Sequence, residues 1–86
     1  MYQIQFSKKA QKRFKALPKS IQQRLIVQIN LLPHNPRPLD CKKMKGVRDL
    51  FRLRVGDYRV IYTVQDELLL ILVVEVGHRR EIYRDY

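Results

Sequence analysis

Acidic residues are missing from the first 39 positions, where every charged side chain is Lys or Arg. Over the whole chain, 18 Lys and Arg residues outnumber 8 Asp and Glu residues, and the formal net charge is +10. Such a field attracts nucleic acid, an anionic membrane surface or an acidic protein. It also strains the compact state by self-repulsion, so we expect an acidic partner that binds the folded chain to stabilise it.

Cysteine and long apolar runs are also scarce. Cys41 stands alone, which excludes an intramolecular disulfide and argues against a cysteine metal cluster, so a reducing cytoplasm is the expected compartment. No apolar run approaches the roughly 18 residues of a membrane helix, so we expect no membrane association. The N-terminus lacks the basic start and apolar stretch of a signal peptide. The length of 86 residues predicts one small domain, residues 1–86.

The motifs of many enzyme classes are absent as well. The sequence has no HExxH, no Walker loop, no Gly-rich dinucleotide turn, no carboxylate pair at motif spacing and no serine with triad partners. His34 has no partner at metal-ligand or catalytic spacing and is interpreted as a surface histidine. We therefore expect neither a metal nor a cofactor.

The strongest local pattern is a predicted hairpin over Leu50–Tyr62. Two runs of β-favouring residues flank Gly56-Asp57, and polar and apolar residues alternate on both sides. A two-residue turn would pair Val55 with Tyr58 and, one step further, Arg54 with Arg59. The residues predicted to face the core are Phe51, Leu53, Val55, Tyr58, Val60 and Tyr62.

Arginines occupy the other face of this hairpin. The register places Arg52, Arg54 and Arg59 there, with Arg54 directly opposite Arg59. Like charges in cross-strand pairs are destabilising, so the arrangement indicates a site for a polyanion, most simply phosphate groups. The alternative is a solvated basic face.

Two helices are predicted before the hairpin. Tyr2–Phe6 alternates as a strand, and Ser7 is the expected N-cap of a helix over Lys8–Leu17. Pro18 suits the first position of a second amphipathic helix over Lys19–Leu32. Their Lys and Arg side chains are explained by a solvated helix surface, or alternatively by direct contact with nucleic acid.

The remaining strand is predicted after the hairpin. The seven apolar residues Leu68–Val74 suit a central strand buried on both faces, and Gly77 is expected to break it. Glu75 interrupts the apolar run and could pair with a neighbouring arginine. The order β-α-α-β-β-β predicts an α+β fold, with a small, mostly antiparallel sheet, a helical hairpin on one face and an open basic face.

This arrangement would bring a second group of residues to the arginines. The last strand runs back beside Tyr58, so Gly77-His78-Arg79 is expected near the arginine face. Attack of a ribose 2′-hydroxyl on the adjacent phosphate needs a proton acceptor, positive charge on the phosphorane and a proton donor. Arginines supply the charge, His78 titrates in the useful range, and Tyr83 could stack on a base. The alternatives are that His78 is an ordinary histidine at the end of a strand and that Tyr83 is an aromatic side chain that only packs.

The joint pattern of these segments resembles the RelE/ParE toxin superfamily, in particular the RelE branch of type II toxin–antitoxin systems. The segments are Lys43-Met44-Lys45-Gly46, Arg52-Leu53-Arg54, Gly56–Tyr62 and Val76–Tyr83. The resemblance implies a metal-independent endoribonuclease that cleaves mRNA in the A site of the 70S ribosome. It also implies a RelB-like antitoxin, whose complex with the toxin binds operator DNA.

The resemblance also assigns roles to positions. The family's functional residues fall on Arg52, Arg54, Arg59, His78, Arg79 and Tyr83. Lys43 and Lys45, with Arg52 and Arg54, are expected to bind substrate. Some members have lysine where this chain has Arg52 and Arg54, and arginine cannot act as a base. Proton transfer therefore falls to His78, or to substrate-assisted and ribosome-assisted chemistry. The rival functions are a ParE-like inhibitor of DNA gyrase and a non-catalytic basic RNA-binding domain.

Overall fold

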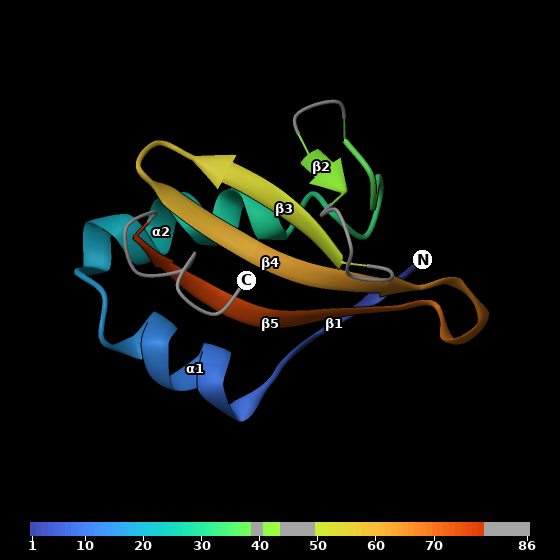
Figure 1. The fold of residues 1–86 in the computed structure, drawn as a ribbon, viewed down its shortest axis with the longest axis horizontal. Coiled ribbons are helices and arrows are strands. Elements are labelled where there is room, and N and C mark those ends of the chain that lie inside the picture. Colours follow the sequence, from blue (N-terminus) through green and yellow to red (C-terminus); the bar gives the residue numbers. More distant parts are fainter. Residues whose placement is uncertain (39–40, 44–49, 79–86) are drawn as a thin grey trace.

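The computed structural model describes residues 1–38, 41–43 and 50–78 of the chain, and for 41–43 the backbone alone (Figure 1). The elements are β1 Gln3–Phe6, α1 Lys8–Lys15, α2 Lys19–Ile29, β2 Cys41–Lys43, β3 Leu50–Val55, β4 Tyr58–Gln65, the 3₁₀ helix η1 Asp66–Leu68 and β5 Leu70–His78. The sheet has the order β1-β5-β4-β3-β2; β1 pairs with β5 in parallel and the other pairs are antiparallel. Within the described part, no helix is long and apolar enough to span a membrane.

Both helices begin close to where the sequence predicts. The Ser7 hydroxyl accepts a hydrogen bond from the Ala10 amide at 3.1 Å, which confirms it as the N-cap of α1. It also donates to the Val74 carbonyl at 3.1 Å, so the start of α1 is fixed to β5. Pro18 is the residue before α2 rather than its first helical residue. The helix ends at Ile29, and the turns that follow keep Leu32 buried.

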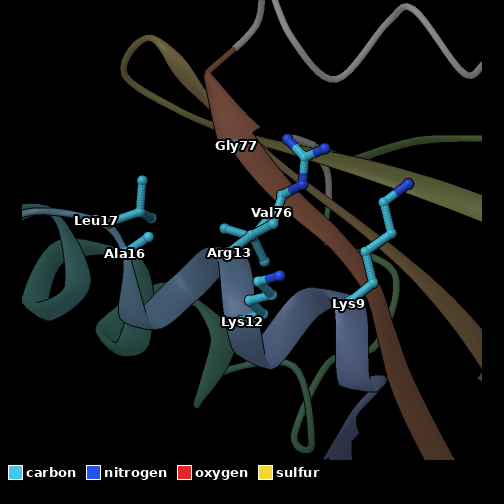
Figure 2. A pocket seen from close by; sticks show the side chains of 7 residues that line it. All are labelled: Lys9, Lys12, Arg13, Ala16, Leu17, Val76 and Gly77. Carbon is cyan, nitrogen blue, oxygen red and sulfur yellow. The ribbon is translucent and has the colours of Figure 1, made fainter.

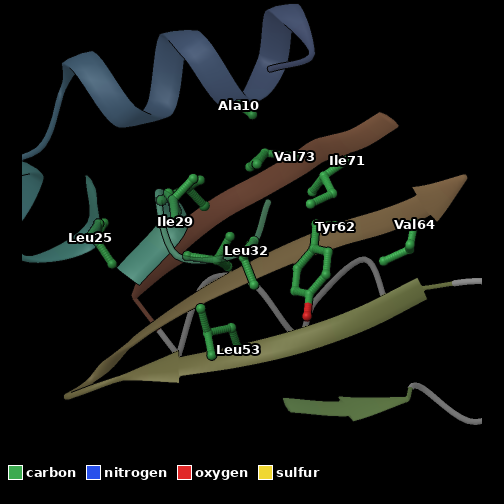
Figure 3. Close-up of a cluster of buried hydrophobic side chains, with 11 residues drawn as sticks. Ala10, Leu25, Ile29, Leu32, Leu53, Tyr62, Val64, Ile71 and Val73 are labelled. Atoms are coloured by element: carbon green, nitrogen blue, oxygen red, sulfur yellow. The ribbon is translucent and has the colours of Figure 1, made fainter. Parts of the chain in front are cut away.

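One hydrophobic cluster lies between the helices and the sheet (Figure 3). Leu25 and Ile29 of α2 are fully buried there, and so is Tyr62 of β4. Burying a leucine or isoleucine side chain contributes about 1.5–3 kcal/mol, so this stripe of α2 is a principal source of stability. All six hairpin residues predicted to face the core belong to this cluster or pack against it.

The predicted register of the hairpin is confirmed. Val55 pairs with Tyr58, Arg54 with Arg59, and the ladder continues to Phe51 opposite Tyr62. The opposite face is open only in part, however. Arg54 is exposed, but Ile61 is fully buried and forms a second small cluster with Leu50 and Val74. This face is therefore not uniformly open and basic, as the sequence predicts, because an apolar cluster covers part of it.

Three details of the sheet differ from the sequence prediction. β5 begins at Leu70, because Leu68 belongs to η1 and Leu69 has a left-handed φ of 50°. Gly77 does not break β5, since its pairing with Arg59 keeps it in the ladder despite its weak strand propensity. The short strand β2 was not predicted; it has three residues, too few for a sequence pattern.

The loop after α2 is fastened to the end of the sheet away from the hairpin turn. The Tyr62 hydroxyl donates to the Pro36 carbonyl at 2.8 Å. The Arg37 guanidinium lies 5.4 Å from the centre of the Phe51 ring and 2.8 Å from Asp66 Oδ2. Hydrogen bonds from Arg37 and then from the Tyr2 hydroxyl hold the pKa of Asp66 below its usual value.

Removal of the Asp66 carboxylate should therefore lower stability in a pH-dependent way. Because the folded pKa of Asp66 is depressed, its contribution is present above the unfolded pKa of about 4 and is lost as pH falls through the folded value. We expect Asp66→Asn to lower the melting temperature at pH 7, and the gap from wild type to narrow as the pH falls below the unfolded pKa and through the depressed folded pKa of Asp66. Thermal unfolding followed by circular dichroism measures both. Glu67→Gln, which removes a neighbouring exposed carboxylate, is the control, and an equal loss in both variants would contradict the prediction.

Candidate functional site

The turn between β3 and β4 is built around Gly56. Its φ is +61°, a conformation that residues with a Cβ adopt at a cost. Space is limited as well, because a Cβ at this position would lie 3.0 Å from Nη2 of Arg24. The positive φ therefore favours glycine here, and the flexible end of the Arg24 side chain would have to shift by a few tenths of an ångström to admit a Cβ.

The Gly56 carbonyl holds the two opposed arginines. Arg54 Nε donates to this oxygen at 3.2 Å, and Arg59 Nη1 donates to it at 3.4 Å. Arg59 Nη1 also donates to the Tyr58 carbonyl at 3.2 Å. These acceptors are neutral, so the hydrogen bonds orient both guanidiniums and leave their positive charges in place.

The two arginines differ in exposure. Arg59 is 7% exposed, whereas Arg54 is open to solvent and Arg52 is intermediate. A charge surrounded by protein is less screened than one in water, so Arg59 strengthens the positive potential at the turn. Arg54 can touch an anion directly. Together they suit a phosphate group better than either does alone.

Arg24 is a residue that the sequence interpretation missed. It is one of many basic residues on the two helices, and nothing in its spacing distinguishes it. In the fold, α2 carries its exposed side chain to the hairpin turn, beside Gly56. We refer to Arg24, Arg54 and Arg59 as the turn arginines. They come from α2, β3 and β4, so only tertiary structure brings the first of them to the other two.

The end of β5 lies beside the hairpin, as predicted. Gly77 pairs with Arg59, and His78 pairs with Tyr58. The His78 ring makes an edge contact with the Tyr58 ring, with 5.5 Å between the ring centres. Tyr58 packs against the core cluster, so His78 shares the helix-covered face. The expectation that His78 joins the arginine face is therefore wrong, because strand alternation places Gly77 there instead.

Several predicted residues are not tested by this geometry. Lys45, Arg79 and Tyr83 lie outside the described residues. Lys43 is at the end of β2, paired with Phe51, and its side chain is not described. Within the described residues, no three His, Cys, Asp or Glu side chains come together as metal ligands would.

A basic groove of about 600 Å³ runs between α1 and β5 (Figure 2). Figure 2 shows Lys9 and Arg13 reaching from α1 toward β5. Both contact the buried carboxylate of Glu75, so part of the charge in this groove is already neutralised. The lining residues are Lys9, Lys12, Arg13, Ala16, Leu17, Val76 and Gly77.

The contact between Arg24 and the turn is open to a double-mutant test. We expect Gly56→Ala to cost roughly 1–2 kcal/mol from its positive φ, and more from the clash with Arg24. In an Arg24→Ala background the clash is gone, so the same substitution should cost less. Urea unfolding of the four proteins measures the coupling. Strictly additive losses would contradict the predicted coupling between Arg24 and Gly56.

Comparisons with known proteins agree with this geometry. A family model described as the ParE toxin of the type II toxin–antitoxin system parDE matches residues 4–83. A RelE-like toxin protein of Escherichia coli is 36% identical over 80 residues, which cover 91% of this chain and 83% of the relative. The mRNA interferase toxin RelE of Escherichia coli K12 is 28% identical over 88 residues, covering 98% of this chain and 92% of the relative.

Solved structures of the same group share the fold. The toxin in the archaeal RelE–RelB complex from Pyrococcus horikoshii OT3 superposes with a TM-score of 0.80 and 32% sequence identity, covering 93% of this chain and 97% of that chain. Sequence and fold thus agree over nearly the whole length. The chain belongs to the ParE toxin family of type II toxin–antitoxin systems, within which it is a RelE-like toxin.

Proposed function

We propose that the chain is a ribosome-dependent endoribonuclease that cleaves mRNA in the ribosomal A site and so inhibits translation. The observation that carries this proposal is the opposed pair Arg54 and Arg59, oriented on the Gly56 carbonyl with Arg24 beside the turn. A relative named as an mRNA interferase toxin supports it. Like charges are held together at a cost, and a phosphodiester is a ligand that offsets this cost.

The chemistry proposed for this site is transesterification at phosphorus. The ribose 2′-oxygen forms a bond to the adjacent phosphorus as its proton leaves, and the bond from phosphorus to the 5′-oxygen breaks as that oxygen gains a proton. The products are a 2′,3′-cyclic phosphate and a 5′-hydroxyl. Negative charge builds up on the phosphorane between these steps, and the turn arginines would stabilise it.

Arg59 and Arg54 have different parts in this scheme. Arg54, exposed on β3, contacts the phosphate, and Arg59, buried beside it, adds a positive potential that water screens less. Arg79 is proposed to share the transition-state charge and Tyr83 to orient a base or the nucleophile. Arg52, Lys43 and Lys45 are proposed to bind the RNA backbone.

Proton transfer is the step for which the position of His78 matters most. Its ring packs on Tyr58, on the helix-covered side of the sheet. Arginine keeps its proton at any physiological pH, so the turn arginines do not supply a base. The geometry therefore favours substrate-assisted or ribosome-assisted proton transfer, with His78 as the rival group on this chain.

An acidic antitoxin is the proposed partner. The acid-free first 39 residues and the net charge of +10 favour an acidic protein. The similar archaeal toxin was solved in complex with a RelB protein. We propose a RelB-like antitoxin that blocks the toxin and carries the complex to operator DNA.

Loss of either opposed arginine should abolish most cleavage. We expect Arg54→Ala and Arg59→Ala each to lower cleavage of translated mRNA by roughly a hundredfold or more, because each removes charge from the transition state. Primer extension on mRNA in a reconstituted translation reaction measures it. Lys19→Ala is the matched control, since it removes one exposed positive charge at the start of α2, and it should cleave normally.

Two results would contradict the proposal. If Arg59→Ala cleaves as well as wild type, the turn arginines do not take part in the cleavage step. Accumulation of gyrase-cleaved DNA with mRNA left intact would instead identify a ParE-like gyrase inhibitor.

The pH dependence of cleavage distinguishes the role of His78 from that of the arginines. We expect His78→Gln to keep cleavage within about tenfold of wild type and to keep the shape of the pH–rate profile. Single-turnover cleavage on stalled ribosomes between pH 5.5 and 8.5 gives this profile. If the variant loses a limb of the profile that wild type shows, proton transfer belongs to His78.

A further inference from the structure

Glu75 is a buried carboxylate for which the proposed chemistry has no use. It is 1% exposed and lies in β5, two residues before Gly77. Its Oε2 is 2.8 Å from Lys9 Nζ, and its Oε1 is 3.4 Å from Arg13 Nε. The Val76 amide donates to Oε1 at 3.1 Å. Buried ion pairs of this kind are a weak source of stability, so their presence calls for another explanation.

The neighbouring sequence leaves the register of β5 poorly defined. Leu68–Val74 is continuously apolar, so a shift of one residue would still present apolar side chains to both faces of the sheet. Both faces accept them: Val73 belongs to the core cluster, and Val74 packs with Ile61 on the other side. Hydrophobic burial alone therefore does not select one alignment of β5 with β4.

The alignment that forms contains an irregularity at this point. Tyr62 pairs with Val73 but Ile61 pairs with Glu75, so Val74 is an extra residue in β5. As a result Val73 and Val76 both belong to the core cluster, although residues three apart lie on opposite faces of a regular strand. Beyond the bulge, Gly77 comes opposite Arg59 and His78 opposite Tyr58.

Without the bulge the end of β5 would be arranged differently. Continuing the Tyr62–Val73 register would place Glu75 opposite Val60, which is fully buried in the core cluster. It would also place Val76 opposite Arg59, so an isopropyl group would occupy the position beside that guanidinium. In that register the carboxylate would face the apolar core cluster that contains Val60, and the cost of burying it there works against this alignment.

The cations that hold Glu75 are fixed relative to the same strand. Lys9 and Arg13 are four residues apart, so they share one face of α1. The start of this helix is attached to β5 just before the bulge, since the Ser7 amide donates to the Val73 carbonyl at 2.9 Å and its hydroxyl to the Val74 carbonyl. α1 is therefore attached to β5 at two points, one at Val73 and Val74 and the other at Glu75.

We propose that Glu75 is a positioning residue, whose ion pairs with α1 select the bulged register of β5 and so place Gly77, rather than Val76, beside Arg59. Its effect on activity rests on the proposed function, whereas its effect on register does not. Glu75 touches no reacting group and acts only through the alignment of β5 with β4.

The test uses the full chain with Glu75→Leu and Glu75→Gln. We expect Glu75→Leu to keep a melting temperature within a few degrees of wild type, because an apolar side chain can replace a buried ion pair. Cleavage of mRNA on the ribosome should nevertheless fall at least tenfold in kcat, with KM little changed. In NMR spectra, the nuclear Overhauser effects between the Tyr58 and His78 rings and between Val60 and Val76 should weaken or disappear. Glu75→Gln keeps the shape of the side chain and serves as the second variant in case Glu75→Leu fails to fold. It should show the same changes to a smaller degree.

Matched variants separate register from charge. Glu67→Gln removes an exposed carboxylate from η1, with the same change in net charge, and should leave both the spectra and cleavage unchanged. Lys9→Gln with Arg13→Gln should reproduce the loss of the cross-strand contacts. Lys12→Gln, from the same helix and the same groove, should not.

The proposal is overturned if Glu75→Gln and Glu75→Leu keep the cross-strand contacts, whatever their activity. It is also overturned if the contacts are lost but cleavage stays at the wild-type level. If wild-type protein cleaves no mRNA, the proposed function fails, and the NMR contacts still decide whether Glu75 selects the register.

Discussion

The site depends on one electrostatic conflict, the direct opposition of Arg54 and Arg59 across the hairpin. The Gly56 carbonyl reduces this conflict by accepting hydrogen bonds from both guanidiniums, which orients them toward the turn. A carbonyl can be shared in this way only where the turn is tight, and the positive φ of Gly56 makes it so. The turn thus holds two guanidinium groups close together.

Two carboxylates of the described structure pair with basic side chains away from the hairpin turn. Glu75 neutralises basic side chains of α1, and Asp66 pairs with Arg37 at the far end of the sheet. Neither lies at the hairpin turn. Asp57, by contrast, lies in the hairpin turn itself, so the turn carries a carboxylate as well as its arginines. The net charge of +10 nevertheless favours anionic ligands, whether a nucleic acid or an acidic protein.

The two helices do more than cover the core. α2 buries Leu25 and Ile29 and, from the next position along the helix, brings Arg24 to the turn. α1 is attached to β5 through Ser7 and through the cations around Glu75. Each helix thus both packs on the core and contacts part of the site: α2 contacts the hairpin turn, and α1 contacts β5. This explains how a small domain keeps a strained, positively charged turn in a defined shape.

The sequence by itself determined the local parts of this protein. Alternation with period two and a two-residue turn predicted every pair of the hairpin from Val55–Tyr58 to Phe51–Tyr62, and Ser7 predicted the start of α1, because these features depend on neighbouring residues. Tertiary structure alone decided the rest. It set the bulge in β5 and the side of the sheet that His78 takes, it buried Arg59, and it brought Arg24 to Gly56. Local patterns do not determine any of these features, because each depends on how segments distant in the sequence pack against one another.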